Sequence, residues 1–272
     1  MATEWKSLAG RITIFLDPSP VALPSALGLY KKVWTDDPIN YQGSTNPLAP
    51  SLAQGKRGGL GVTCTINATR VDFTLTSPGA ESTTEPPKLY VIENSAELHT
   101  ELTRIAHLVG QNLLANNVLR VATFLQIISI EDSPAVANRV LMSIIPSRYR
   151  FKLNTEEEFV LQISQPRMST RVENVKLNLI NKWSVDRFGV MSVVMPMAAA
   201  PLTAPQPQAA HLAEFITASI AFDHNNMPVP RDQPLSSSQQ ASLLLEELAL
   251  TTTSIRESAI DVKGFEDEKL LH

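Results

Sequence analysis

The sequence predicts an α+β protein in which a mainly antiparallel sheet carries helices on one face. Apolar and polar side chains alternate in three consecutive segments, 159–164, 174–183 and 188–195. Such alternation is typical of pleated strands that have one buried and one hydrated face, as in antiparallel sheets. Helical spacing of apolar residues after Asn94 and after Ser236 predicts the helices that would cover the buried face.

The first half of the chain has the order of a ferredoxin-like unit: strand, helix, strand, strand, helix, strand. The elements are predicted at residues 11–16, 25–34, 60–66, 70–75, 94–115 and 119–130. Asn67, Ala68 and Thr69 join the two middle strands as a hairpin. The polar segment 35–56 is predicted to be a long surface loop, and residues 89–92 a short strand.

The helix boundaries follow from capping residues. Asn94 is a predicted N-cap with Glu97 completing a capping box, and the helix is expected to end at Asn116. Ser133 precedes Pro134 and predicts a short helix over 134–143. A fourth strand at 215–222 and a helix over 236–256 close the chain. We therefore expect a ferredoxin-like subdomain over 1–131, an antiparallel-sheet subdomain over 132–258 and a loosely held tail over 259–272.

Composition excludes several classes of protein. The chain has 272 residues, is 43% hydrophobic and carries a formal charge of -4, so it can form a core but has no global field that attracts nucleic acid or anionic lipid. Cys64 is the single cysteine, so no internal disulfide or thiolate zinc site is expected, and its place in a strand predicts a buried, inert thiol. No metal or cofactor is predicted. The lack of a secretory start or a long apolar run predicts a cytoplasmic protein that does not enter a membrane.

Residues 55–61 form the glycine-rich stretch Gly-Lys-Arg-Gly-Gly-Leu-Gly. Its amides could form a nest for phosphate, with Lys56 and Arg57 adding charge. A P-loop requires Ser or Thr after the lysine and then a helix, whereas Arg57 and a predicted strand follow here. A flexible lead into a strand is the favoured interpretation, and whether the loop binds an anion stays open.

A basic segment predicts a nucleic-acid-binding alternative. Arg148, Arg150 and Lys152 would share one face of an extended strand, with the aromatic residues between them on the other. Arg167 and Arg171 could add to this surface and grip a nucleic-acid backbone. The competing interpretation is an edge strand whose cations prevent aggregation.

No catalytic residue set is predicted. His99 and His107 are eight residues apart on one helix, which is poor spacing for a metal, and both are expected on the helix surface. Asp223, His224 and Asn225 end a predicted strand. They could support acid–base chemistry or bind a hard cation, but they are also common turn residues.

The C-terminal part resembles a known family. The strand at 215–222, the turn at Asp223, His224 and Asn225, a proline-bearing loop and the helix at 243–256 look like the end of a sporadically distributed, uncharacterised bacterial family of similar length. The resemblance covers mainly the last quarter. It implies a bacterial, cytosolic α+β protein and carries no catalytic residues.

The sequence therefore favours a non-enzymatic function. We expect a protein–protein interaction or scaffold component that acts through sheet edges and long loops, as an oligomer or within a complex. The first alternative is a nucleic-acid-binding module using the basic segment. The second is a hydrolase or transferase using the Asp223 turn together with residues 55–61.

Overall fold

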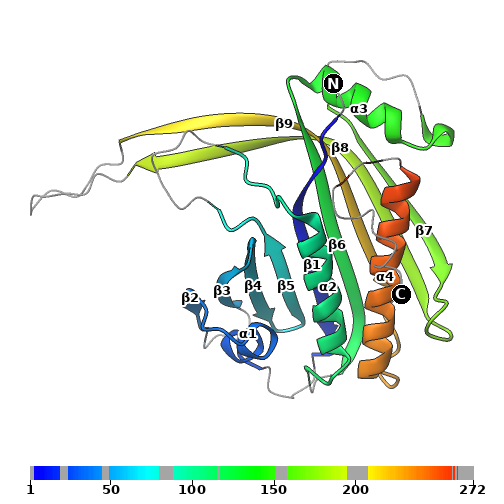
Figure 1. Cartoon of the computed structure of the whole chain (residues 1–272). Coiled ribbons are helices and arrows are strands. Elements are labelled where there is room, and N and C mark those ends of the chain that lie inside the picture. Colours follow the sequence, from blue (N-terminus) through cyan, green and yellow to red (C-terminus); the bar gives the residue numbers. More distant parts are fainter. Residues whose placement is uncertain are drawn as a thin grey trace, which may run out of the picture.

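The computed structural model describes residues 3–18, 24–44, 49–79, 88–114, 117–150, 158–194 and 208–258, together with 260 and 262 (Figure 1). The strands are β1 (Lys6–Leu16), β2 (Asn40–Gln42), β3 (Ser51–Arg57), β4 (Leu60–Asn67), β5 (Arg70–Thr76), β6 (Val118–Glu131), β7 (Val160–Met168), β8 (Lys176–Val194) and β9 (Gln208–Asn226). The helices are α1 (Ala26–Trp34), α2 (Ser95–Val109), α3 (Pro134–Ile144) and α4 (Ser237–Glu257), with a 3-10 turn, η1 (Ser147–Tyr149).

These strands form one sheet in the order β2-β3-β4-β5-β1-β6-β9-β8-β7. Every pairing between neighbouring strands is antiparallel. The α+β class and the dominant antiparallel sheet are therefore confirmed. Strands from both predicted subdomains belong to this single sheet.

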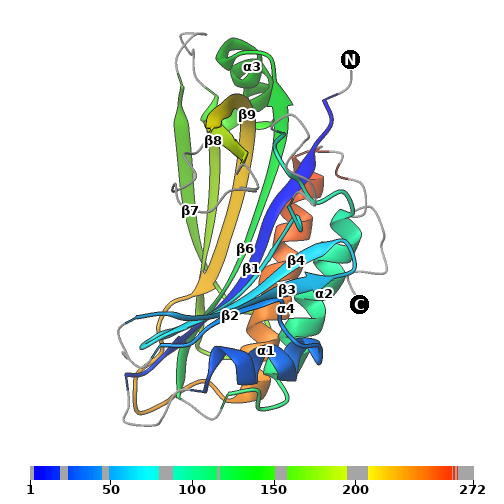
Figure 2. The same ribbon diagram turned by 90° about the vertical axis from the view of Figure 1, so that its left-hand side faces the viewer.

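Helices α1, α2 and α4 pack on one face of the sheet (Figure 2). Trp34 of α1 meets Phe73 of β5 edge-on, with the ring centroids 6.0 Å apart. Leu98 of α2 lies over Gly10 of β1, 2.8 Å from the position that a Cβ would take. Because directly paired residues of neighbouring strands share a face, the register extends this buried face across the sheet.

Strands β4 and β5 show why this face is buried. Alternate residues of both strands are almost inaccessible to solvent, among them Cys64 and Phe73. Cys64 is confirmed as buried, and burial raises the pKa of its thiol to about 12. The thiolate is the reactive form of cysteine, so this residue is chemically inert at neutral pH.

The ferredoxin-like order of the first half is not found, because four strands separate α1 from α2. Strands β2 and β3 lie within the segment predicted as a surface loop, so that prediction is wrong. The reason is visible at Gly55 of β3, where the Tyr30 hydroxyl of α1 is only 2.0 Å from the position of a Cβ. The helix fills the space that a strand side chain would normally occupy, so β3 lacks an apolar alternation. Residues 89–92 form only an isolated bridge, from Ile92 to Ser7.

The alternating segment around residue 180 is a strand, as predicted, but it is longer. Residues 176–183 and 188–194 of the two predicted segments belong to the single strand β8, since Val185 continues the buried alternation between them, and residue 195 lies outside the described residues. Strand β9 likewise continues to Asn226, and the predicted turn at Asp223 is wrong. Neighbours on both sides satisfy its backbone, while the Asn226 side chain accepts a hydrogen bond from the Val121 amide at 2.7 Å.

The predicted helix starts are confirmed. Asn94, Ser133 and Ser236 each accept a hydrogen bond from the amide three residues later. Helix α2 ends earlier than expected, at Val109, with Gly110 as its C-cap. His99 is 4% exposed and lies near Thr252 of α4, so its prediction as a surface residue is wrong.

Candidate functional site: the sheet edges and the β8–β9 ribbon

The predicted basic strand is not a strand where the chain is described. Arg148 lies in η1, which begins after Pro146, and Lys152 lies outside the described residues. The Arg150 guanidinium donates to the carbonyl oxygens of Ile145 at 2.9 Å and Ser143 at 3.0 Å. The Arg150 side chain therefore satisfies carbonyl oxygens at the C-terminal end of α3. These hydrogen bonds explain why the chain turns here instead of extending.

Arg167 and Arg171 lie elsewhere. Arg167 is near the end of β7, and Arg171 is exposed in the turn between β7 and β8. Glu246 of α4 holds this turn by accepting from Thr170, whose amide and hydroxyl are both 2.8 Å away. Figure 1 places α3 and this turn at opposite ends of the strands. Of the five predicted nucleic-acid residues, the four that the structure describes are thus not brought together as one strand face.

The glycine-rich turn binds an anionic side chain of the same protein, the carboxylate of Glu97. Gly58 has a left-handed backbone, with φ at 56°, and the Gly59 amide donates to the Glu97 carboxylate at 3.0 Å. Glu97 comes from the first turn of α2, so the internal hydrogen bond ties the β3–β4 hairpin to that helix. Arg57 also turns inward, with its guanidinium 3.3 Å from the Trp34 carbonyl oxygen.

We expect Gly58→Ala to lower the free energy of unfolding by about 2 kcal/mol, because a left-handed backbone disfavours alanine and a hydrogen bond to a charged group is lost. A Cβ on Gly58 would stand 2.1 Å from a Glu97 carboxylate oxygen. Urea unfolding would measure the loss. Gly79→Ala is the matched control, because Gly79 has φ at 77° and no atom of the described residues lies within 4 Å of its Cβ position. Equal losses in both variants would mean that the Glu97 contact contributes nothing.

His224 lies in the core between the sheet and α4, not at a surface turn. It is fully buried, with Nε2 3.1 Å from the Asn181 Oδ1 and Nδ1 3.0 Å from the Thr251 hydroxyl. Burial lowers its pKa to about 4, so the imidazole is neutral at physiological pH. Glu247 of α4 is also fully buried, and burial raises its pKa well above the usual range, with the charge of Asp223 adding to the effect.

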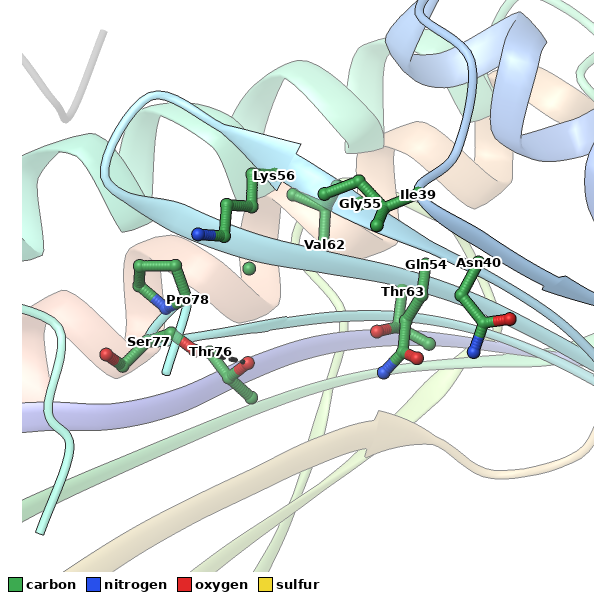
Figure 3. Close-up of a pocket in the computed structure, with 11 residues that line it drawn as sticks. Ile39, Asn40, Gln54, Gly55, Lys56, Val62, Thr63, Thr76, Ser77 and Pro78 are labelled. Atoms are coloured by element: carbon green, nitrogen blue, oxygen red, sulfur yellow. Dashed lines mark hydrogen bonds between the residues drawn. The ribbon is translucent and has the colours of Figure 1, made fainter. Parts of the chain in front are cut away.

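The buried pair His224 and Glu247 forms structural contacts and not an active site. His224 and Glu247 have no solvent-accessible surface through which a substrate could reach them. The sheet order places β9 four strand spacings from β4, which is about 19 Å. A pocket of about 250 Å³ is lined by Gly55, Lys56 and Gly61 among others, but by no residue from 223 to 226 (Figure 3). The two parts of the predicted enzyme site therefore do not share this pocket.

The sheet has two edges of different character. At one end, β2 is only three residues long. At the other, β7 has nine residues and exposes Val160 and Met168, which are 64% and 55% accessible. Pro166 lies inside β7 and has no amide hydrogen to offer a further strand. The accessible part of this edge is therefore its first half.

Strands β8 and β9 continue past the rest of the sheet as a two-stranded ribbon (Figures 1 and 2). The last β8 residue paired with β7 is Ser184, and the last β9 residue paired with β6 is Ile216. Beyond these residues their mutual pairing continues from Phe188 opposite Phe215 to Val194 opposite Gln208. Seven strand residues correspond to about 23 Å. Over this length each strand pairs only with the other, among the residues that the structure describes.

The ribbon has an ionic base and an apolar sequence. At its base, the Arg187 guanidinium pairs with Glu158 and, at 3.1 Å, with Glu214. Residues 188–194 contain no charged residue, and Glu214 is the single Asp, Glu, Lys or Arg within 208–215. Sequence reasoning missed the second strand of the ribbon because its alanines hide the alternation. The signal that could have revealed this strand is the lack of charged residues in the two segments that flank residues 195–207.

No family model, curated protein or solved structure matches the chain. The resemblance to the sporadically distributed bacterial family and the cytoplasmic location therefore stay predictions. Among the described helices, none is long and apolar enough to cross a membrane. Within the described part of the chain, no group of three or more His, Cys, Asp or Glu side chains is placed to hold a metal ion.

Proposed function

We propose that this protein is a non-enzymatic protein–protein interaction component that associates through the β8–β9 ribbon, as an oligomer or within a complex. The observation that carries the proposal is the ribbon itself, whose two outer edges have no strand partner among the described residues. Backbone amide and carbonyl groups on such edges can pair with a strand of another chain.

The β8–β9 ribbon has little stability of its own. An isolated two-stranded ribbon is marginally stable in water, because it has neither a third strand nor a covering layer. Its low charge means that little electrostatic repulsion opposes close contact with a second protein surface. A partner strand would supply both the missing hydrogen bonds and the missing apolar contact. The competing edge, β7, is interrupted by Pro166 and is the poorer candidate.

The test is a variant without the ribbon. Phe188 and Phe215 are directly opposite in the register, so Asn-Gly can replace residues 189–214 and close the hairpin with a two-residue turn. Size-exclusion chromatography with light scattering would give the mass of each protein, alone and with co-expressed neighbours. We expect the wild type to associate and the shortened protein to be monomeric and still folded by circular dichroism.

The opposite edge provides the control. Ile39 and Tyr41 beside and within β2 are 73% and 44% exposed, and the double variant I39S/Y41S should associate like the wild type. A wild type that stays monomeric at all concentrations and retains no partner would contradict the proposal. So would a shortened protein that associates as well as the full chain.

A further inference from the structure

The sheet face opposite the helices carries a cluster of arginines and phenylalanines. Arg11 and Phe15 lie on β1, Arg70 on β5, and Arg120 and Phe124 on β6. The register pairs Arg11 with Phe124 and Phe15 with both Arg70 and Arg120. Because Arg11 and Phe15 alternate with the buried Ile12 and Ile14, they lie on the face away from the core.

The cations of this cluster lie against the aromatic rings. The guanidinium carbons of Arg70 and Arg120 lie 5.6 Å and 4.7 Å from the centroid of Phe15. The guanidinium carbon of Arg11 lies 5.0 Å from the centroid of Phe124. These distances are those of cation–π contacts, so the cluster presents flat, positively charged stacks.

Asp72 of β5 holds the arginines in place. It accepts hydrogen bonds from the Arg70 Nε at 2.9 Å and from the Thr13 hydroxyl at 2.6 Å, and it lies 3.7 Å from the Arg11 Nε. The Nε atoms of Arg11 and Arg120 are buried and have no hydrogen-bond partner among the described residues. The side chains of Arg11 and Arg70 remain 34% and 32% exposed. The stacks are thus ordered yet accessible.

The same face continues into the pocket of about 250 Å³. Lys56 lines it and is exposed. One register row crosses six strands, and its members are Asn40, Gln54, Thr63, Thr74, Arg11 and Phe124. Figure 3 shows the polar ends of Asn40, Gln54 and Thr63 close together in this pocket. The pocket and the arginine–phenylalanine cluster therefore form one continuous polar surface, which we call the open face.

Charge on the open face differs in sign from that of the whole chain. The arginine–phenylalanine cluster carries Arg11, Arg70 and Arg120 against Asp72, an excess of two positive charges, whereas the chain has a formal charge of -4. Asp223 lies one strand farther, opposite Phe124. An anionic partner is complementary to this surface and would be repelled by the rest of the molecule.

We propose that the open face binds single-stranded nucleic acid. Lys56 and Arg120 contact phosphates, and unpaired bases stack on the arginine–phenylalanine pairs of Phe15 and Phe124. Exposed aromatic rings on an antiparallel sheet, and guanidinium planes, are the surfaces on which proteins stack splayed-out bases. An acidic peptide would use the cations but not the stacks, and a duplex would keep its bases out of reach.

Fluorescence anisotropy with labelled dT12 and U12 tests the proposal, using the full chain. We expect both oligomers to bind, a 12-base-pair DNA duplex to bind at least tenfold more weakly, and polyglutamate to compete poorly. The variant K56Q/R120Q should bind at least tenfold more weakly than the wild type. The slope of log affinity against log salt concentration should fall by about 1.4, which is about 0.7 for each lost phosphate contact.

Three further variants separate binding from folding. K32Q/R139Q removes the same charge from exposed positions on α1 and α3, and it should bind like the wild type. Phe124→Leu should weaken binding about tenfold, the effect of losing one stacked base, while Phe124→Tyr should retain it. Circular dichroism would confirm that each variant is folded.

Several outcomes would overturn the inference. These are no binding of either oligomer, equal binding of the duplex, competition by polyglutamate at the same charge concentration, or an equal loss in K32Q/R139Q. The ribbon is not part of the open face, so the ribbon-less protein should bind the oligomers normally. Failure of this inference would therefore leave the proposed association through the ribbon untouched.

Discussion

Replacing Trp34 by alanine is expected to lower the free energy of unfolding by about 4 kcal/mol, the usual cost of removing a fully buried tryptophan. Trp34 is 0% exposed and packs against Tyr30, with ring centroids 4.8 Å apart. It also joins α1 to α2, because its indole N–H donates to Glu101 at 2.7 Å. Urea unfolding at neutral pH would measure the loss.

The expected loss at Trp34 includes an electrostatic part. Glu101 is 7% exposed, and burial by itself would raise its pKa, but hydrogen bonds from Arg104 and Trp34 hold the pKa below its usual value. Trp34→Ala leaves this buried carboxylate with one fewer donor. Trp34→Phe keeps most of the ring and loses the N–H, so we expect a smaller loss of about 1–2 kcal/mol. A loss below about 1 kcal/mol for Trp34→Ala would contradict the central place of α1 in the core.

His224 is expected to make the protein sensitive to acid. The pKa of the imidazole is about 4 in the folded state and about 6.5 when unfolded. The unfolded state therefore binds more protons between these values, and stability falls as the pH is lowered from about 6.5 through 4. The full change amounts to about 3 kcal/mol. It is absent above about pH 6.5, where both states are neutral.

The measurement is the difference between the wild type and His224→Gln in urea unfolding at pH 7, 5.5 and 4. This comparison is needed because Glu247 has the opposite effect: its raised pKa makes stability fall as the pH rises above about 4.5. We expect the wild type to lose about 3 kcal/mol more than His224→Gln between pH 7 and pH 4. His107→Gln, which removes a histidine from an exposed position of α2, is the control variant. Parallel profiles for all three proteins would show that His224 can be protonated without unfolding.

Local features of the fold were predicted well. Strand alternation around residue 180 and the caps at Asn94, Ser133 and Ser236 act between residues that are close in sequence, so they can be read without a tertiary structure. The prediction failed where a distant element takes over a local role. Gly55 is a strand residue because Tyr30 fills the space above it, and His99 is buried because α4 packs beside α2.

The candidate sites were less predictable. Asp223, His224 and Asn225 have turn chemistry, yet β6 and β8 hold them in a strand from both sides. The glycine-rich stretch was interpreted as a flexible lead into a strand, with anion binding left open, and its Gly59 amide binds the carboxylate of Glu97, 38 residues away. Arg11, Arg70 and Arg120 are separated by tens of residues and carry no motif. Only the pairing of β5, β1 and β6 brings them onto two phenylalanine rings.

Side-chain periodicity and hydrogen bonds within a few residues are enough to predict the secondary structure type, the buried face of each regular strand and the starts of the helices. The tertiary structure decided the strand order, the length of the β8–β9 ribbon and the gathering of charge on the open face. Those properties arise from pairing between strands far apart in the chain. An alternating pattern predicts which face of a strand is buried, but it does not predict which other strand pairs with it.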